Sequence, residues 1–163
     1  MRYAKIDSCE ITNGKHVGVS LYVQGCEFHC KGCFNSSTWD FNNGREWDGT
    51  TENYVLDLCS KHYIKRLSCL GGEPMHPANA DSVINLMKRF KELYPDKKVW
   101  MWTGYKFEDI PNKDVLNYAD FIIDGLFKEK LKDLSLEFRG SSNQRVWKKG
   151  TDGIWALKKR QIN

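Results

Sequence analysis

Short apolar runs and amphipathic stretches alternate along this chain. Runs rich in β-branched and aromatic residues are typical of strands, and we expect strands at residues 3–11, 17–23, 64–70, 98–102 and 121–125. Apolar residues at helical spacing predict helices from residue 50 or 51 to 62, from 79 to 94 and over 112–118. Because strand and helix alternate, the sequence predicts an α/β fold of right-handed βαβ units with a mainly parallel sheet.

Residues at the ends of the predicted helices indicate where those helices begin or stop. Thr50 or Thr51 can cap the first helix, with Glu52 in its first turn. Pro95 stops the second helix, since proline cannot continue the hydrogen-bond ladder. After residue 125 the periodicity weakens. There we expect a polar loop at 138–145 and small strands at 146–147 and 154–155, and earlier in the chain a short helix at 36–39.

Distinctive loops follow four of the predicted strands. They are the cysteine segment 25–35, Gly71-Gly72-Glu73-Pro74, Thr103-Gly104-Tyr105 and Asp124-Gly125. In parallel α/β folds the carboxyl ends of the strands carry the functional site. We therefore expect these four loops to converge on one mouth.

The cysteine segment carries the strongest chemical signal. Cys26, Cys30 and Cys33 stand at C-x3-C-x2-C spacing, with no fourth cysteine close by. Three thiolates on a four-iron cluster leave one iron without a protein ligand, just as three ligands leave a catalytic zinc open to a reacting molecule. An electron-transfer cluster would be closed by four cysteines instead.

Other interpretations of the three cysteines stay open at this point. A zinc site could use His29 or a distant cysteine as its fourth ligand, although zinc ligands usually come as two separated pairs. A disulfide needs an oxidising compartment, which nothing in the sequence suggests. Unrelated buried thiols, or a thiol redox pair formed by Cys30 and Cys33, are the remaining possibilities.

The other loop residues have both functional and structural interpretations. Gly71 and Gly72 let the backbone approach a ligand closely or form a plain turn before Pro74. Glu73 is either an acceptor for a ligand ammonium or a solvated turn residue. The hydroxyl and open backbone of Thr103 and Gly104 suit a pocket wall or a strand-end turn.

Some residues have simpler assignments. Phe28 and Phe34 flank the thiols and can shield a cluster or pack in a core. His29 and His76 are weak candidates, because a lone histidine is weak support for a site. Asp124 is a site acid or the polar end of a strand, and Cys69 is more simply a buried core residue.

Length and charge place few further limits. The 163 residues suit one domain, residues 1–163, and the formal net charge of +4 permits an acidic partner without demanding nucleic acid. No apolar run approaches the ~18 residues of a membrane helix, and no signal core is seen, so we expect a cytoplasmic protein. Cys59 is most simply a core residue, Cys9 has no assignment, and the Lys158-Lys159-Arg160 tail is of open role.

The residues also resemble a known pattern. Cys26-x3-Cys30-x2-Cys33 followed by Gly71-Gly72-Glu73-Pro74 resembles the radical S-adenosylmethionine superfamily. Within it, the chain is most similar to the activating proteins of anaerobic ribonucleoside-triphosphate reductase. The segments that carry this closer resemblance are residues 22–26, 32–35, 102–105, 123–127 and 139–145. Many superfamily members have an aromatic residue before the third cysteine, where this chain has Gly32, so Phe34 becomes the candidate beside the adenine.

The resemblance implies a fold, cofactors and partners. It implies a truncated, TIM-like βα barrel and a [4Fe-4S] cluster held by Cys26, Cys30 and Cys33. S-adenosylmethionine would chelate the fourth iron, and its reductive cleavage would give a 5′-deoxyadenosyl radical that generates a glycyl radical on the large reductase subunit. A flavodoxin or ferredoxin is the implied electron donor. No catalytic side chain is implied beyond the cluster and cofactor, and the implied cofactor-binding residues are Gly32, Cys33, Phe34, Gly71, Gly72, Glu73, Thr103 and Gly104.

Three rival functions remain beside this expectation. The chain could activate another glycyl-radical enzyme, such as pyruvate formate-lyase, or act on a small molecule, as a deazaguanine synthase does. The second rival is an adaptor that binds zinc or a cluster without catalysis, and the third is a thiol redox protein, which would need an exposed cysteine of low pKa. The loop at 139–145 together with Thr103-Gly104-Tyr105 favours the reductase-activating family.

Overall fold

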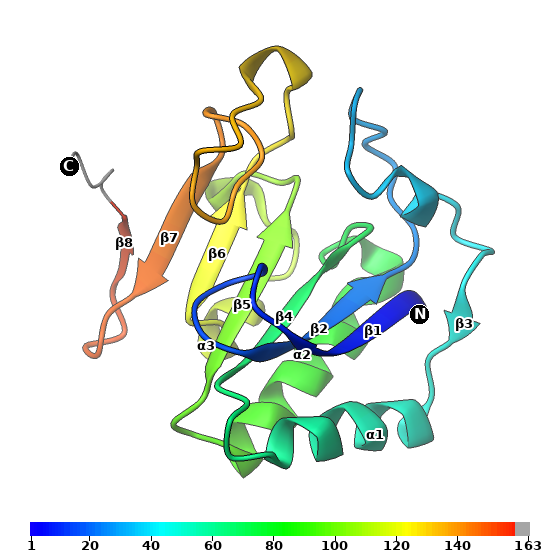
Figure 1. Ribbon diagram of the computed structural model, residues 1–163, viewed down its shortest axis with the longest axis vertical. Coiled ribbons are helices and arrows are strands. Elements are labelled where there is room, and N and C mark those ends of the chain that lie inside the picture. Colours follow the sequence, from blue (N-terminus) through cyan, green and yellow to red (C-terminus); the bar gives the residue numbers. More distant parts are fainter. Residues whose placement is uncertain (159–163) are drawn as a thin grey trace.

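A computed structural model describes residues 1–158 of the chain (Figure 1). Within these residues a single eight-stranded sheet has the order β3-β1-β2-β4-β5-β6-β7-β8. The strands are β1 (Arg2–Glu10), β2 (Gly18–Val23), β3 (Arg45–Glu46), β4 (Arg66–Gly71), β5 (Lys98–Thr103), β6 (Phe121–Asp124), β7 (Arg145–Lys149) and β8 (Trp155–Leu157). The helices are α1 (Gly49–Ser60), α2 (Pro77–Leu93) and α3 (Val115–Tyr118), with single 3-10 turns η1 (Ser36–Thr38), η2 (Phe107–Asp109) and η3 (Glu129–Leu131).

The centre of the sheet is parallel and its two flanks are antiparallel. Strands β2, β4, β5 and β6 pair in parallel, with Leu21 opposite Cys69 and Met101 opposite Ile122. On one side β1 pairs antiparallel with β2 and β3, and on the other β7 pairs antiparallel with β6 and β8. The predicted α/β class and parallel βαβ centre are confirmed, and the antiparallel flanks make the whole sheet mixed.

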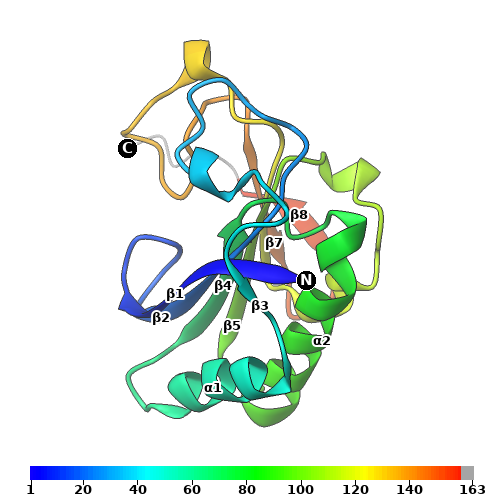
Figure 2. The same ribbon diagram turned by 90° about the vertical axis from the view of Figure 1, so that its right-hand side faces the viewer.

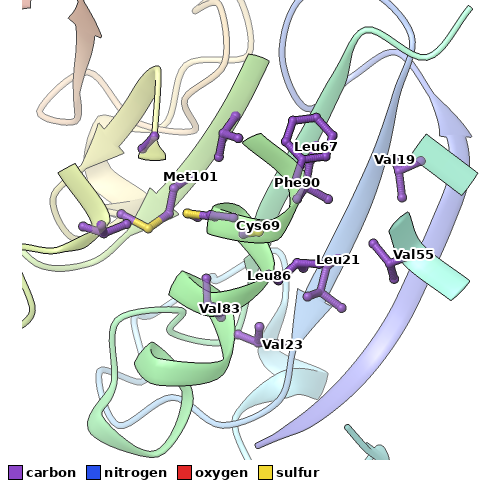
Figure 3. Packing of buried hydrophobic residues seen from close by; sticks show 14 of the residues in the cluster. Val19, Leu21, Val23, Val55, Leu67, Cys69, Val83, Leu86, Phe90 and Met101 are labelled. Atoms are coloured by element: carbon purple, nitrogen blue, oxygen red, sulfur yellow. The ribbon is translucent and has the colours of Figure 1, made fainter. Parts of the chain in front are cut away.

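The main hydrophobic core lies between one sheet face and helices α1 and α2, which Figure 2 shows together on the same side of the sheet. Alternate positions of the central strands, such as Leu21, Leu67 and Met101, point to this side because successive strand residues face opposite ways. Leu86 and Phe90 of α2 pack against them (Figure 3). Burial of such side chains stabilises the sheet–helix pair by about 1.5–3 kcal/mol each.

A buried ion pair lies on the opposite face of the sheet. The guanidinium of Arg66 is fully buried, with its Nη1 2.7 Å from Glu10 Oε1 and 2.7 Å from Ser68 Oγ. Burial alone would raise the pKa of Glu10, but hydrogen bonds from Arg66, Ser20 and Asn13 outweigh burial and lower this pKa to about 2. The pair ties β1 to β4 across β2 and fastens the 11–17 loop, because Arg66 also donates to the carbonyl of Lys15.

Several predicted boundaries shift by a few residues. The cap of α1 is Asp48, whose Oδ1 accepts from the Thr51 backbone N–H at 2.7 Å, so the prediction of Thr50 or Thr51 as cap is wrong. Helix α2 begins at Pro77, because His76 Nδ1 accepts from the backbone of Ala78 and proline needs no donor in the first turn. The expected helix at 36–39 is a single 3-10 turn, and α3 is shorter than expected. Of the basic tail, residues 159 and 160 lie outside the described part of the chain.

Candidate functional site

The four loops expected to converge do border one cavity. It has a volume of about 770 Å³ and lies at the carboxyl ends of the parallel strands. Every predicted site residue except Gly32 lines this cavity. The residues are Cys26, Cys30, Cys33, Phe34, Gly71, Gly72, Glu73, Thr103 and Gly104, and the fourth loop contributes Gly125. Ligand pockets typically measure about 300–1,000 Å³, so this cavity is large enough for a cluster with a small molecule beside it.

The cysteine loop is held by backbone contacts to the segment that follows it. Gly25 N–H donates to the Thr38 carbonyl at 2.7 Å, and Cys26 N–H donates to the Trp39 carbonyl at 3.0 Å. Gly25 has a φ of 99°, a conformation that favours glycine. The Asn35 backbone N–H lies 3.4 Å from the Cys33 sulfur and donates to it. The loop that follows β2 therefore leaves the sheet in a defined direction.

Burial changes the protonation of the thiols. It raises the pKa of Cys26 to about 11, and it also raises the pKa of Cys30, with the nearby Cys33 thiol adding to the effect. Thiolates, not thiols, bind metal. Without metal, Cys26 and Cys30 are thiols at neutral pH, and metal binding has to displace their protons.

The donor set fits an open cluster. Of the six cysteines, only Cys26, Cys30 and Cys33 line the cavity, and all six lie within the described residues. Cys59 and Cys69 belong to the hydrophobic core and Cys9 is exposed, so the expectation that Cys59 and Cys69 are structural is confirmed.

A single-ion site is not formed by the described residues. Among residues 1–158, no three His, Cys, Asp or Glu side chains are close enough together to hold one metal ion. The ring of His29 stacks on Trp39 at 4.6 Å. In a four-iron cluster each cysteine binds a different iron. The cysteine sulfurs therefore stand further apart than the ligand atoms around a single metal ion.

The Gly-Gly pair forms a close contact with the cysteine loop. Gly72 N–H donates to the Val23 carbonyl and Glu73 N–H to the Gly25 carbonyl, both at 2.8 Å. A Cβ on Gly72 would overlap the Gly25 carbonyl oxygen, and Gly71 has a φ of 103° with Tyr22 Cα only 2.8 Å from the place of a Cβ. These glycines therefore let two protein backbones meet. The use predicted for them from the sequence, a close approach of the backbone to a ligand, stays a prediction.

Glu73 points inward and is 2% exposed, so the expectation of a solvated turn residue is wrong. Its Oε1 accepts from the Thr103 hydroxyl at 2.7 Å and the Met75 N–H at 2.9 Å, and its Oε2 accepts from the Gly104 N–H at 2.7 Å. Burial raises the pKa of Glu73 to about 7, against the lowering effect of these hydrogen bonds. The carboxylate links the loop after β4 to the loop after β5.

Gly32 and Phe34 differ in their relation to the cavity. Gly32 has a φ of 73°, which disfavours a side chain, and Glu129 occupies the space next to it. An aromatic residue at this position would be strained in this backbone conformation. Phe34 does line the cavity, is 59% exposed, and lies 5.2 Å from the ring of Phe127.

Part of the cavity wall was not predicted from the sequence. Tyr22 and Trp102 line it from β2 and β5, and Trp39 lines it from the turn after the cysteines. Alternation along the two strands could have identified the first two, since they face away from the core. Trp39 carried no signal, because no periodicity links it to the cysteines that it contacts.

The polar loop at 139–145 borders the cavity from the other side. Gln144 Oε1 accepts from the backbone of Gly140 and Ser141, and Gln144 Nε2 donates to the Gly125 carbonyl at 3.0 Å. Asp124 is fully buried and pairs with Arg145, so it anchors this loop rather than acting as a site acid. The segment is thus a cavity wall fastened to the end of β6.

The fold and the site together define an α/β protein in which three cysteines line one cavity at the carboxyl ends of the parallel strands. A family model described as a 4Fe-4S single cluster domain matches residues 12–147. Curated relatives named anaerobic ribonucleoside-triphosphate reductase-activating protein are similar over almost the whole chain. The protein from Enterobacteria phage T4 is 43% identical (95% of this chain, 98% of the relative), that of Vibrio cholerae 38% and that of Escherichia coli K12 37% (each 90% and 97%).

The chain belongs to the family of anaerobic ribonucleoside-triphosphate reductase-activating proteins. The family resemblance seen in the sequence is thereby confirmed. None of the helices in the described residues has the length and apolar character needed to cross a membrane.

Proposed function

We propose that this chain is a radical S-adenosylmethionine activase that generates a glycyl radical on the large subunit of anaerobic ribonucleoside-triphosphate reductase. The observation that carries the proposal is the single cavity bordered by both Cys26-x3-Cys30-x2-Cys33 and Gly71-Gly72, in a member of this family. The proposal treats residues 1–163 as one radical S-adenosylmethionine domain.

The cofactor supplies the difficult chemistry. When bound, a [4Fe-4S] cluster with S-adenosylmethionine would supply the one-electron reductive chemistry that removes a hydrogen atom from a glycine of the partner. Cys26, Cys30 and Cys33 would hold the cluster. The remaining lining residues would bind and orient the cofactor and keep water away, with Gly71 and Gly72 near its methionine end and Phe34 near its adenine.

The partner would complete the site. The sheet has separate edge strands, β3 and β8, in the described residues, which suits the truncated barrel expected from the resemblance. A glycine-bearing loop of the large subunit would cover the cavity. We further propose a flavodoxin or ferredoxin as electron donor, a cytoplasmic location and no nucleic-acid partner.

Anaerobic reconstitution tests the cluster directly. We expect the wild-type protein to bind four iron and four labile sulfide per chain, as the cluster formula requires, and to turn brown. Cys30→Ala should lose most of this iron. Cys9→Ala is the matched control, since Cys9 is exposed and away from the cavity. Zinc instead of iron, or full iron content in Cys30→Ala, would contradict the proposal and favour an adaptor or a thiol redox protein.

The partner is tested by electron paramagnetic resonance. The reduced, reconstituted protein is mixed with the large reductase subunit and S-adenosylmethionine, and a glycyl-radical signal is expected. Cleavage of S-adenosylmethionine without that signal, but with a radical on another glycyl-radical enzyme or turnover of a small substrate, would favour a rival enzyme function.

A further inference from the structure

The buried carboxylate of Glu73 joins three segments of the cavity wall. Its own backbone N–H is bonded to the Gly25 carbonyl, at the start of the cysteine loop. Its side chain bonds the hydroxyl of Thr103 and the backbone N–H of Gly104, both at 2.7 Å. The Asn79 side chain, 1% exposed, fixes this arrangement, because its Nδ2 donates to the carbonyls of Gln24 and Glu73 at 3.1 and 3.0 Å.

Most of the hydrogen-bonding capacity of this carboxylate is used inside the protein. A carboxylate has about four acceptor positions, and the donors Met75, Thr103 and Gly104 occupy three of them. The Thr103 hydroxyl is also engaged inside the protein, since its one O–H donates to Glu73 and its oxygen accepts from the Tyr105 N–H at 3.2 Å. Neither side chain is therefore arranged primarily to meet a ligand.

The loop that Glu73 holds is in close contact with the cysteine loop. A Cβ on Gly104 would come within 2.5 Å of the Phe28 ring, so Gly104 packs directly against Phe28 and any side chain at residue 104 would clash with the ring. Phe28 lies between Cys26 and Cys30, and its ring also meets Tyr105 at 4.9 Å. A displacement of Gly104 would consequently change the wall that faces the bound cofactor.

We propose that Glu73 is a positioning residue, which serves the cavity by holding the Thr103–Gly104 backbone in place and does not act mainly as the acceptor for the cofactor's ammonium group. This inference rests on the proposed function, because it concerns how the same cavity binds S-adenosylmethionine. A carboxyl group suits the role because both of its oxygens can accept: Oε1 accepts from Thr103 and Met75, and Oε2 accepts from Gly104.

Ligand binding by the reconstituted protein tests the proposal. The variants are Glu73→Gln, Thr103→Val, the double variant and Thr103→Ser, and the ligands are S-adenosylmethionine and its desamino analogue, which lacks the ammonium group. Glutamine has a single side-chain oxygen and cannot accept at both positions, so we expect about tenfold weaker binding of both ligands, as for one buried donor left without an acceptor. Thr103→Val should weaken both ligands as well, the double variant should be no worse than Glu73→Gln, and Thr103→Ser should resemble the wild type.

A direct ammonium contact predicts another pattern. Glu73→Gln would then weaken S-adenosylmethionine but leave the desamino analogue unchanged, Thr103→Val would have little effect, and the two effects would add. That result would overturn the proposal.

Hydrogen exchange of the Gly104 amide separates this inference from the proposed function. We expect faster exchange at Gly104 in Glu73→Gln than in the wild type, with or without cofactor. The single amide oxygen should stay with the two donors Met75 and Thr103, and the Nε2 group that then faces the Gly104 N–H cannot accept. Unchanged exchange would refute the positioning role. If no variant or wild-type sample binds S-adenosylmethionine, the proposed function fails, while the exchange result still decides the role of Glu73.

Discussion

Arg66 is a fully buried cation, and the stability of the folded protein depends on the single carboxylate that pairs with it. Its Nη1 lies 2.7 Å from Glu10 Oε1, and its remaining bonds go to neutral groups. Removing one partner of a buried pair leaves an uncompensated charge, so we expect Glu10→Gln to lower the free energy of unfolding by about 3–5 kcal/mol at pH 7. Urea unfolding followed by circular dichroism measures this change.

Glu46→Gln is the matched control for that substitution. Glu46 pairs with Arg2 at 3.5 Å and its side chain is 87% exposed, so its loss should change stability by less than about 1 kcal/mol. The pKa of Glu10 is lowered from 4.5 to about 2, so its contribution is complete above pH 4.5 and disappears as the pH falls toward 2. Equal stability of wild type and Glu10→Gln at pH 7 would contradict this assignment.

At the scale of single residues, the sequence predicted chemistry better than orientation. The cysteines and the Gly-Gly pair could be assigned because their spacing and lack of side chains limit what they can do. Glu73 could not, since the inward direction of its side chain depends on donors from Thr103 and Gly104, which are distant in sequence. Trp39 and the Arg66–Glu10 pair were missed for the same reason, because their partners come from other elements.

At the scale of elements, periodicity predicted the central strands and both long helices but not the pairing direction of the flanks. Alternation of residues is the same in parallel and antiparallel strands, so nothing in residues 2–10 or 145–149 marked them as antiparallel. Helix starts shifted because the caps Asp48 and His76 lie outside the periodic segments. The convergence of the loops was predictable, since it follows from parallel βαβ order alone.

The junction between the loop after β4 and the cysteine loop is sensitive to a single methyl group. Gly72→Ala places a Cβ against the Gly25 carbonyl oxygen and 3.0 Å from the Gly25 nitrogen, and both are backbone atoms that cannot rotate away. We expect at least a tenfold loss of S-adenosylmethionine affinity in the reconstituted protein, because the displaced loops would no longer fit the ligand. A tenfold loss corresponds to about 1.4 kcal/mol of binding free energy. Equilibrium binding measures it.

Gly49→Ala provides the comparison for that junction. Gly49 begins α1, and no atom lies within 4 Å of the place where its Cβ would be. Alanine favours the helix over glycine by up to about 1 kcal/mol, so this variant should bind the ligand as the wild type does. Wild-type affinity in Gly72→Ala would show that the two loops need not touch.

At the scale of the whole molecule, the core and the site lie on different parts of the sheet. The core packs β2, β4 and β5 against α1 and α2, whereas the loop that carries the three cysteines lies beyond the carboxyl end of β2 (Figure 1). The metal-free chain should therefore unfold cooperatively, and cluster binding should raise its melting temperature because the folded chain holds the three cysteines in one cavity and binds the cluster more tightly than the unfolded chain does. Calorimetry of both forms, compared with Cys30→Ala, measures this difference.

Hydrogen exchange locates where that stabilisation acts. The increase in protection on cluster binding should concentrate in residues 24–41 and 71–74, which are joined by the bonds from Gly72 and Glu73 to Val23 and Gly25. Buried amides of α2 should change little, because their bonds form independently of the cysteine loop. A metal-free chain without a cooperative transition would mean that the cluster is needed to form the core itself, and the separation between core and site would be wrong.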